Sequence, residues 1–272
     1  TIFSDIVDYN LKPGTPFSRS NIEATKKAIE FVLGGKGFAL PSVLANIALQ
    51  DTTGLVDITF RVDPKKKSFV RRINIRGNTK TNDEVYRREL RQFESSTYSQ
   101  NKLERSKIRL QRLKFVNKVD VKKTIVDDES GYIDIDFLID ETQSGEFKVG
   151  AGYSDSSGAI FNIKLQQDNF LGRGNNVALE VERSSSRKLV RYRNTDPYFT
   201  KNGISKSTSI VVSETDVSAT STAAYISDTL AYGINYNVPI SEARSYGYGA
   251  ELIFTDYTTT IGSPTNVTNF IN

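Results

Sequence analysis

The sequence contains no cysteine, histidine, methionine or tryptophan in its 272 residues. Without cysteine there is neither a disulfide nor a thiolate nucleophile, and without histidine there is no imidazole to act as a general base. The soft and nitrogen ligands that hold most transition metals are missing for the same reason. We therefore expect this chain to be no enzyme and to use no cofactor or metal.

Long apolar runs are also missing, because nowhere does the chain reach the length of about 18 apolar residues that a membrane-spanning helix needs. No signal-peptide pattern follows Thr1, and a chain that begins without methionine is expected to be a fragment. What the chain does have is 38% hydrophobic and 25% charged residues, which excludes a disordered polymer. Its length favours about two domains.

The positive charge belongs to the first half of the chain. Residues 1–145 carry 25 basic and 20 acidic side chains, whereas residues 146–272 carry 11 and 12. Eight of the cations lie within residues 61–80. Such a run is more often a solvated face than a dedicated anion site.

The first half also contains a tandem repeat. Residues 17–29 (FSRSNIEATKKAI) match residues 98–110 (YSQNKLERSKIRL), and residues 54–63 (GLVDITFRVD) match residues 131–140 (GYIDIDFLID), in polarity and in the turn glycine. Each copy reads as strand, helix, helix, strand, strand, with the opening strand absent from the first copy. In that copy a helix is predicted from Ser18 to the glycines at 34 and 35. Because the glycine-rich stretch 34–39 precedes a strand, a phosphate-binding loop is disfavoured.

The second copy is predicted to have one apolar and one charged sheet face. Apolar and polar residues alternate through residues 69–76, which places Phe69 on the buried face under the helices. A basic α/β unit could also be an RNA-binding sheet, but that needs aromatic side chains on the open face. Here the open face carries charges, namely Arg72, Arg76, Lys122, Asp134 and Asp136.

A helix is predicted over residues 81–94 of the second copy. Thr81 and Glu84 have the spacing of a reciprocal helix cap, and Tyr86, Leu90 and Phe93 recur with helical periodicity. These three apolar residues are expected to face inward. The outer face would then carry Arg87, Arg88, Arg91 and Glu94.

Residues 146–272 have a different pattern, rich in glycine, serine, threonine, asparagine and tyrosine. Apolar and polar residues alternate in about seven strands of the length that spans a membrane. A soluble sandwich shares this alternation, but six tyrosines at strand ends or on the apolar face favour an outer-membrane barrel with an aromatic girdle. They are Tyr225, Tyr232, Tyr236, Tyr246, Tyr248 and Tyr257. Since closed bacterial barrels have an even number of strands, the chain is expected to stop partway through its barrel.

The predicted organisation resembles the BamA family of outer-membrane assembly factors, whose members join POTRA domains to a β-barrel. The resemblance covers nearly the whole chain and is carried by four stretches: IRGNTKTNDEVYRRELRQFE (75–94), FKVGAGYSDSSG (147–158), QQDNFLGRGN (166–175) and NTDPYFTKNGIS (194–205). It implies an α+β fold of POTRA repeats (β-α-α-β-β) followed by an antiparallel transmembrane β-barrel, incomplete here. The domains would be a penultimate POTRA domain at 1–65, the last POTRA domain at 66–143 and the start of the barrel at 146–272.

The same resemblance implies a function. Members of the family fold and insert β-barrel proteins into the bacterial outer membrane, with their POTRA domains in the periplasm. The partners implied are accessory lipoproteins, unfolded outer-membrane clients and lipid, without nucleic acid. In the family the last POTRA domain docks a lipoprotein, which assigns that role to Arg87, Arg88, Arg91 and Glu94. A related POTRA-barrel transporter of the translocation-and-assembly or two-partner secretion type shares these gross features. A barrel hydrolase is the weakest alternative, because it needs an imidazole base.

Two sites are predicted in the barrel. The first strand is expected to be a weakly closed edge, because Gly150 and Gly152 leave positions without side chains, and in the family this strand forms one side of a lateral gate. Its residues are Phe147, Lys148, Val149, Gly150, Ala151, Gly152 and Tyr153. A second site is a charge ladder on the lumen face, in which Glu180 and Glu182 face Arg191 and Arg193 across a hairpin, with Glu182 expected opposite Arg191. Simple wetting of the lumen is the alternative role for these charges.

Overall fold

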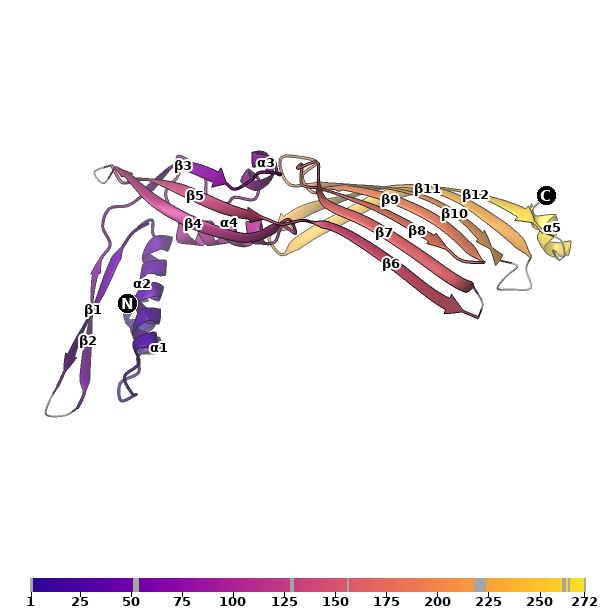
Figure 1. The fold of residues 1–272 in the computed structure, drawn as a ribbon. Helices are drawn as coiled ribbons and strands as arrows, with labels where there is room; N and C mark the ends of the chain where they lie inside the picture. Colours follow the sequence, from indigo (N-terminus) through magenta and orange to yellow (C-terminus); the bar gives the residue numbers. More distant parts are fainter. Residues whose placement is uncertain are drawn as a thin grey trace. The chain divides into compact units, whose positions relative to one another are not determined.

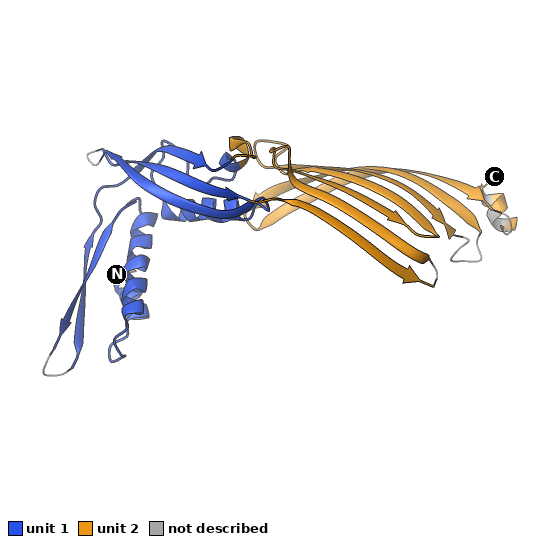
Figure 2. Ribbon diagram, in the orientation of Figure 1, with its two compact units in different colours: residues 1–78, 86–141 blue, residues 79–85, 142–272 orange. Residues whose placement is uncertain are grey.

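The computed structural model describes residues 2–50, 54–127, 130–155, 157–217, 224–260, 263 and 265–271. The chain forms two compact units, shown in different colours in Figure 2. Unit 1 comprises residues 1–78 and 86–141, and unit 2 comprises residues 79–85 and 142–272. Within the described ranges, no helix is long and apolar enough to cross a membrane.

The first repeat of unit 1 consists of two helices and a two-stranded antiparallel sheet (Figure 1). Its elements are α1 (Ile2–Asn10), α2 (Arg19–Gly35), β1 (Ser42–Leu49) and β2 (Val56–Asp63). As predicted, α2 begins after Ser18, whose hydroxyl accepts a hydrogen bond from the Asn21 backbone N–H. The helix packs on the sheet through a small apolar core made of Ile29, Leu33 and Val43, with Phe3, Ile6, Phe38, Phe60 and Val62 around it.

The second repeat contains β3 (Phe69–Arg76), α3 (Asp83–Arg87), α4 (Gln100–Gln111), β4 (Val116–Asp127) and β5 (Tyr132–Glu141). The strands are ordered β3-β5-β4, with β3 parallel and β4 antiparallel to the central strand β5. Alternate residues of β5 are buried on the helix side, as the sequence pattern predicts for a sheet covered on one face. They are Ile133, Ile135, Phe137 and Ile139.

The strand β3 differs from the prediction at its start. Phe69 is 41% exposed, whereas its neighbour Val70 is fully buried. The register with β5 shifts between Val70 and Arg72, which inserts one extra residue, Arg71. Because a bulge of this kind reverses the alternation of faces, the residues before it point to the side opposite to the one that the pattern after it indicates.

The helix predicted over residues 81–94 is also shorter than expected, since α3 covers only Asp83–Arg87. Tyr86 and Leu90 are buried as predicted, but Phe93 is 60% exposed. The backbone N–H groups of Arg91 and Gln92 donate to the Ser106 hydroxyl of α4, at 2.8 and 3.3 Å, instead of to carbonyls one turn earlier. The N–H groups of Glu89 and Leu90 already donate only three residues back, to Tyr86 O and Arg87 O, so the α-helix has ended before this contact with α4.

Unit 2 is dominated by one antiparallel sheet of seven strands, in agreement with the predicted number, ordered β12-β11-β10-β9-β8-β7-β6. It is an open sheet with β6 and β12 at its ends. A short helix, α5 (Thr265–Ile271), follows β12 and was not predicted. The strands are β6 (Gly145–Ser154), β7 (Gly158–Phe170), β8 (Asn175–Arg183), β9 (Arg187–Asp196), β10 (Ser205–Asp216), β11 (Tyr225–Ser241) and β12 (Arg244–Thr259).

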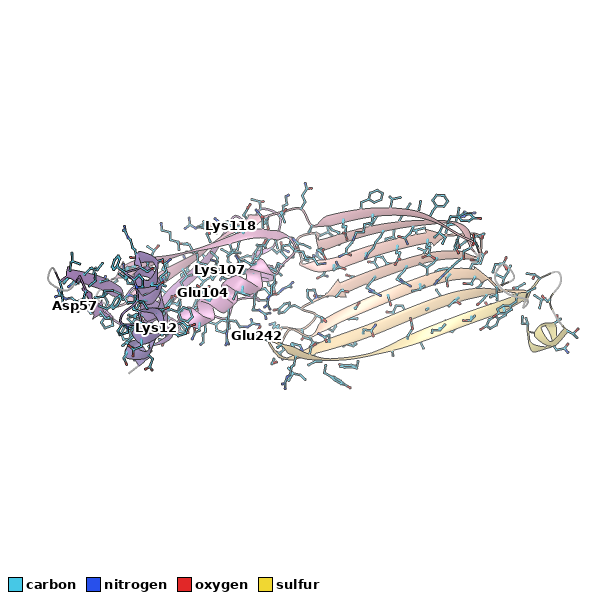
Figure 3. All side chains as sticks on the ribbon, turned by 90° about the horizontal axis from the view of Figure 1, so that it is seen from below. Lys12, Asp57, Glu104, Lys107, Lys118 and Glu242 are labelled. Carbon is cyan, nitrogen blue, oxygen red and sulfur yellow. The ribbon has the colours of Figure 1, made fainter. Side chains whose placement is uncertain are left out.

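The register of this sheet lines up apolar side chains in two rows that cross all seven strands, because residues paired across antiparallel strands point to the same face. Figure 3 shows the side chains along these strands. One row is Phe147, Leu165, Leu179, Tyr192, Ile210, Tyr232 and Leu252; the other is Val149, Ile163, Val181, Val190, Val212, Leu230 and Phe254. We call these two rows the apolar band. All of its members except Leu179 are exposed, by 37% to 66%, as expected for a face that contacts lipid.

Aromatic rings lie near both ends of the β11–β12 hairpin. Tyr225 and Tyr257 meet edge to face at one end, with ring centroids 5.8 Å apart. Tyr236 and Tyr248 stack at 5.6 Å towards the other end. Tyr236 and Tyr248 lie on the face of the apolar band, whereas Tyr225 and Tyr257 lie on the opposite face, because they are an odd number of residues from Leu230 and Phe254. The stacked pair Tyr236 and Tyr248 therefore fits the predicted lipid-facing aromatic girdle, and the pair Tyr225 and Tyr257 does not.

Candidate functional site

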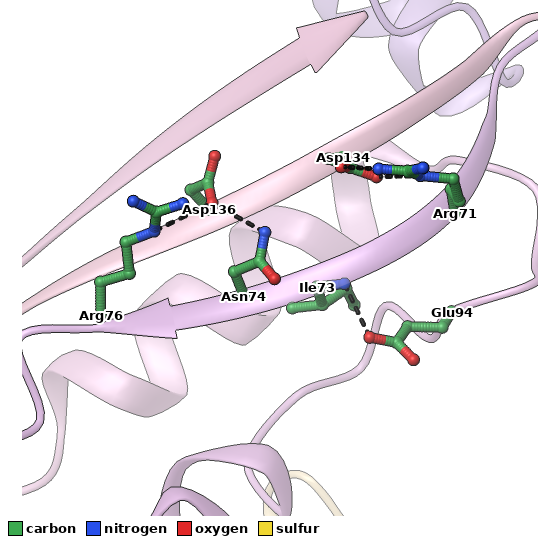
Figure 4. Close-up of polar contacts among 7 residues, drawn as sticks. All are labelled: Arg71, Ile73, Asn74, Arg76, Glu94, Asp134 and Asp136. Carbon is green, nitrogen blue, oxygen red and sulfur yellow. Dashed lines mark hydrogen bonds and ion pairs between the residues drawn. The ribbon is translucent and has the colours of Figure 1, made fainter. Parts of the chain in front are cut away.

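The open face of the second repeat carries ion pairs between β3 and β5 (Figure 4). Arg71 binds Asp134 through two hydrogen bonds, Nε to Oδ1 at 2.9 Å and Nη2 to Oδ2 at 2.6 Å. Hydrogen bonds from Arg71 hold the pKa of the Asp134 carboxyl below its usual range, and the same bonds raise the pKa of Arg71. Asp136 accepts from Asn74 at 2.9 Å and pairs with Arg76 at 3.4 Å. Both carboxylates of β5 on this face are therefore paired with arginines of β3.

At the free edge of β3, two side chains from the predicted partner-binding set contact the strand's backbone. Glu94 Oε1 accepts a hydrogen bond from the Ile73 backbone N–H at 2.7 Å, as Figure 4 shows. Arg87 Nη2 donates to the Ile73 carbonyl at 3.1 Å, and Arg87 Nη1 lies 3.7 Å from Glu94 Oε1. We call this arrangement the edge cap. These two residues thus take part in the module's own sheet.

The other two residues of that set lie in the turns after α3. Arg91 Nη1 donates to backbone carbonyls at the end of this segment, the shortest bond being to Leu90 O at 3.1 Å. Arg88 is half-buried. The predicted single outer helix face is therefore not formed, because the helix ends at Arg87. Whether these residues dock a partner remains a prediction.

The loop after α3 is fixed by Gln92, a residue that the sequence analysis missed. Its fully buried side chain donates to Ser96 Oγ at 2.8 Å and to Thr97 O at 3.1 Å, and it accepts from the Ser99 backbone N–H at 2.9 Å. A buried glutamine whose donors and acceptor are all used holds a loop firmly. The signal available in the sequence was weak, because a glutamine in a polar stretch is usually exposed.

A joint between the two repeats within unit 1 was also missed. Lys123 of β4 donates to the Ala39 carbonyl of the first repeat at 2.8 Å and lies 5.2 Å from the centre of the Tyr98 ring. Burial lowers the pKa of Lys123 and raises the pKa of Tyr98, the latter with help from Glu104. Gly34 also belongs to this joint, because a Cβ there would approach Gln100 Cβ to 2.7 Å.

In unit 2, the predicted gate residues 147–153 lie within β6, an end strand of the sheet. One side of β6 pairs with β7 along its whole length, from Gly145 opposite Gln167 to Ser154 opposite Gly158. Gly152 has open space where a Cβ would be, and Gly150 has only an ordinary contact with Asn162. The two glycines therefore leave a thin, weakly packed stretch in this end strand. Opening of a gate here is untested.

Of the predicted charge ladder, the structure forms a single pair, and it is not the pair that was expected. The turn between β8 and β9 sets Glu180 opposite Arg191, with Arg191 Nη1 donating to Glu180 Oε2 at 3.0 Å. Glu182 instead lies opposite Leu189, and Arg193 lies opposite Ala178. The prediction that Glu182 faces Arg191 was wrong because it assumed a register shifted by two residues. Register in a hairpin depends on the turn, which alternation alone does not define.

The DNFLGRGN motif forms the turn between β7 and β8. Another segment of unit 2, residues 79–85, is hydrogen-bonded to this turn. Asn169 and Leu171 have positive φ angles of 74° and 54°. Asn169 Nδ2 donates to Thr81 Oγ1 at 2.7 Å, and the Asn82 backbone N–H donates to Gly172 O at 2.9 Å. Residues 79–85 thus belong spatially to unit 2, although in sequence they follow β3 and include the first residues of α3. Thr81, predicted as a helix cap, here accepts a hydrogen bond from the turn.

Comparison with protein families identifies both halves of the chain. The model for POTRA, described as a surface antigen variable number repeat, matches residues 3–65 and 68–142. The model for the Omp85 superfamily domain matches residues 169–270. The two POTRA matches together cover about half of the chain.

Comparison with individual proteins points to the same family. The chain is 31% identical over 241 residues to the outer membrane protein assembly factor BamA of Neisseria meningitidis serogroup B, covering 88% of this chain and 30% of that protein. It therefore spans about a third of that relative's length. The crystal structure of Haemophilus ducreyi BamA lacking POTRA domains 1–3 matches with a TM-score of 0.79 at 29% identity, over 93% of this chain and 49% of that one. CdiB from Escherichia coli, with a TM-score of 0.53 at 15% identity, shares the fold alone over 93% of this chain and 49% of its own.

Proposed function

The chain belongs to the family of outer-membrane proteins that join POTRA repeats to an Omp85 domain, and we propose that it acts in assembling β-barrel proteins in the bacterial outer membrane. The observation that carries this proposal is the match to BamA proteins through both the repeats and the sheet, at 29% identity and a TM-score of 0.79 in H. ducreyi. The likeness to CdiB concerns architecture only, so a secretion transporter has no specific observation in its favour.

The mechanism we propose is strand templating at β6. A free strand edge exposes unpaired N–H and C=O groups, which are costly in lipid and which an incoming strand would satisfy. β6 supports this role because it is an end strand and carries Gly150 and Gly152 in its middle. The POTRA repeats would deliver client segments to this edge. Pairing of backbone groups supplies the free energy, so the proposed activity is not enzymatic and uses no cofactor.

The test is a depletion and rescue experiment with the full-length protein. When it is depleted, client barrels should fail to reach their folded form, measured by the shift in electrophoretic mobility between heated and unheated samples. Re-expression should restore folded clients and a truncated form without residues 145–272 should not. Normal client assembly in depleted cells would contradict the proposed function.

We further propose that an accessory lipoprotein docks on the segment that contains Arg87, Arg88, Arg91 and Glu94. Charge complementarity steers such contacts, and a partner that excludes water would strengthen them. Because Glu94 also accepts a hydrogen bond from Ile73, charge reversal alone would mix two effects.

The docking test therefore uses Glu94→Gln beside Glu94→Lys. Glutamine keeps an acceptor oxygen for Ile73 but has no charge, so the midpoint of thermal unfolding should change little while co-purification with the lipoprotein weakens. Glu94→Lys should weaken both. Unchanged co-purification in both variants would place the docking site elsewhere.

A further inference from the structure

The DPYF motif, which has no part in the proposed function, forms the turn between β9 and β10. Asp196 Oδ1 accepts a hydrogen bond from the Tyr198 backbone N–H at 2.9 Å, which fixes the start of the turn. The Gly203 N–H donates to Thr200 O at 3.0 Å and closes its second half. The position of Phe199, between these two hydrogen bonds, is thereby restricted.

Phe199 covers a lysine at the start of β10. The centre of its ring lies 4.8 Å from Lys206 Nζ and 6.0 Å from the centre of the Tyr236 ring, which in turn stacks on Tyr248. A cation at this distance from a ring is attracted to its face. Lys206 is accordingly only partly exposed.

Lys206 lies on the face of the sheet that carries the apolar band. It is four residues from Ile210, a member of the band, and it is paired with Tyr236 of β11 and with Asp196 of β9. Residues paired across strands, and residues an even number of positions apart on one strand, point to the same face. Lys206 and Asp196 therefore stand side by side on the lipid-facing side, next to the stacked tyrosines. Aromatic girdles mark the level of the lipid headgroups.

The two neighbouring charges do not neutralise each other. Lys206 forms no ion pair within the described ranges of the chain, since its ammonium group lies over the Phe199 ring. Asp196 uses Oδ1 for the turn, and its Oδ2 has no hydrogen bond to any residue that the structure describes. One cation and one carboxylate oxygen are thus left for groups outside the protein.

From this arrangement we propose that Lys206 and Asp196 bind the headgroup of phosphatidylethanolamine. Lys206 binds the phosphate, and Asp196 Oδ2 accepts a hydrogen bond from the primary ammonium. Because the two side chains sum to zero charge, a zwitterionic headgroup complements them. Phosphatidylglycerol supplies only the anion, and the ammonium of phosphatidylcholine has no N–H to donate. The site goes beyond the proposed function, since it concerns the membrane around the sheet and not the client proteins.

The test compares these three lipids, with identical acyl chains, on the full-length protein in detergent micelles. Native mass spectrometry measures the fraction of protein that retains one lipid molecule at each lipid concentration. Phosphatidylethanolamine should be retained about two to five times more strongly than the other two lipids, the effect expected from one exposed charge pair. Equal retention of all three lipids, or a preference for phosphatidylglycerol, would overturn the proposal.

Asp196→Asn separates this site from the rest of the lipid-facing surface. Asparagine keeps an acceptor oxygen for the Tyr198 N–H but leaves Lys206 with an uncompensated positive charge. Retention of phosphatidylethanolamine should therefore fall while that of phosphatidylglycerol rises, which reverses the preference. An unchanged preference, or an equal loss of both lipids, would contradict the assigned role of Asp196 and overturn the proposal.

Variants of Lys206 test the phosphate contact. Lys206→Gln should weaken retention of phosphatidylethanolamine about two- to fivefold, whereas Lys206→Arg keeps the charge and should stay within about twofold of the unchanged protein. Lys201→Gln is the matched control, because Lys201 is an exposed lysine of the same turn, and it should have no effect. If Lys206→Gln retains the lipid as well as Lys201→Gln does, the headgroup binds elsewhere and the proposal is wrong. The Asp196→Asn comparison decides the question even if Lys206→Gln does not fold, which heat-dependent mobility would reveal.

Discussion

At the scale of single residues, the turn between β7 and β8 shows why glycine occupies one position. Gly172 has a positive φ of 71°, and a Cβ there would overlap the backbone carbonyl of Lys80. Both features exclude other residues, because L side chains rarely adopt that conformation and a backbone oxygen cannot move aside cheaply. The segment around Thr81 can approach the turn only because this side chain is missing.

We therefore expect Gly172→Ala to lower the free energy of unfolding of unit 2 by about 2 kcal/mol or more. Urea unfolding of the full-length protein in detergent, followed by tyrosine fluorescence, measures the change. Gly152→Ala is the matched control, since that glycine has open space around it and sits in a strand. It should be neutral or stabilising by up to about 1 kcal/mol. Similar losses in both variants would show that the close approach to Lys80 is unimportant.

Asp134 gives a prediction about pH. Its folded-state pKa is lowered by hydrogen bonds from Arg71, so the folded state binds its proton less readily than the unfolded state. The stabilisation is therefore present above the unfolded pKa of about 4 and is lost as pH falls through the lower folded value. Asp134→Asn should flatten the dependence of unfolding free energy on pH below about 4. An unchanged slope would mean that other carboxylates account for the acid sensitivity.

At the scale of strands and helices, the periodicity of apolar residues correctly predicted those features that are determined by residues close together in sequence. It located the α2 helix after Ser18, the buried face of β5 and the seven strands of unit 2. It failed at Phe69, at Phe93 and at Glu182, where the outcome depends on contacts with distant residues or on the conformation of a turn. The bulge at Arg71, the capture of two amides by Ser106 and the β8–β9 register leave no trace in a periodic pattern.

The candidate sites were also predictable only where they do not depend on contacts between residues that are distant in sequence. The exposed residues Arg87 and Glu94 could be named from the sequence, but their bonds to Ile73 could not, because they join positions 14 and 21 residues apart through a strand edge. Gln92 and Lys123 are polar residues whose buried partners become visible only in the folded chain.

The corrected charge ladder makes a prediction about the β8–β9 hairpin. Glu180 and Arg191 are directly opposite and bonded at 3.0 Å, and both are only partly exposed. A double-mutant cycle with Glu180→Gln and Arg191→Gln should give a coupling of about 0.5 to 1 kcal/mol in urea unfolding. The same cycle on Glu182 and Arg191 is the control and should give a coupling near zero. Equal coupling in the two cycles would contradict the observed register.

At the scale of the whole molecule, the lipid-facing apolar band and the proposed role of β6 impose opposite requirements on the free edge of β6. A lipid-facing sheet is stable only when its backbone hydrogen bonds are satisfied, so an end strand within the bilayer must be paired. Templating, however, requires that the same edge be free for part of the time. A weakly packed strand reconciles these demands, since pairing along it can be lost at low cost. The missing side chains at Gly150 and Gly152 fit such a strand.

This argument predicts the effect of locking the edge. Residues 1–272 contain no cysteine, so no native thiol in this part of the chain would compete with a disulfide engineered from Val149, in the apolar band, to the facing residue of the final barrel strand of the full-length protein. The locked protein should fail to assemble client barrels, and reductant should restore assembly, as read from the heat-dependent mobility of the clients. The single Val149→Cys variant is the control and should remain active with or without reductant. If clients assemble at the normal rate while the disulfide is fully formed, β6 does not open, and templating must occur at another edge.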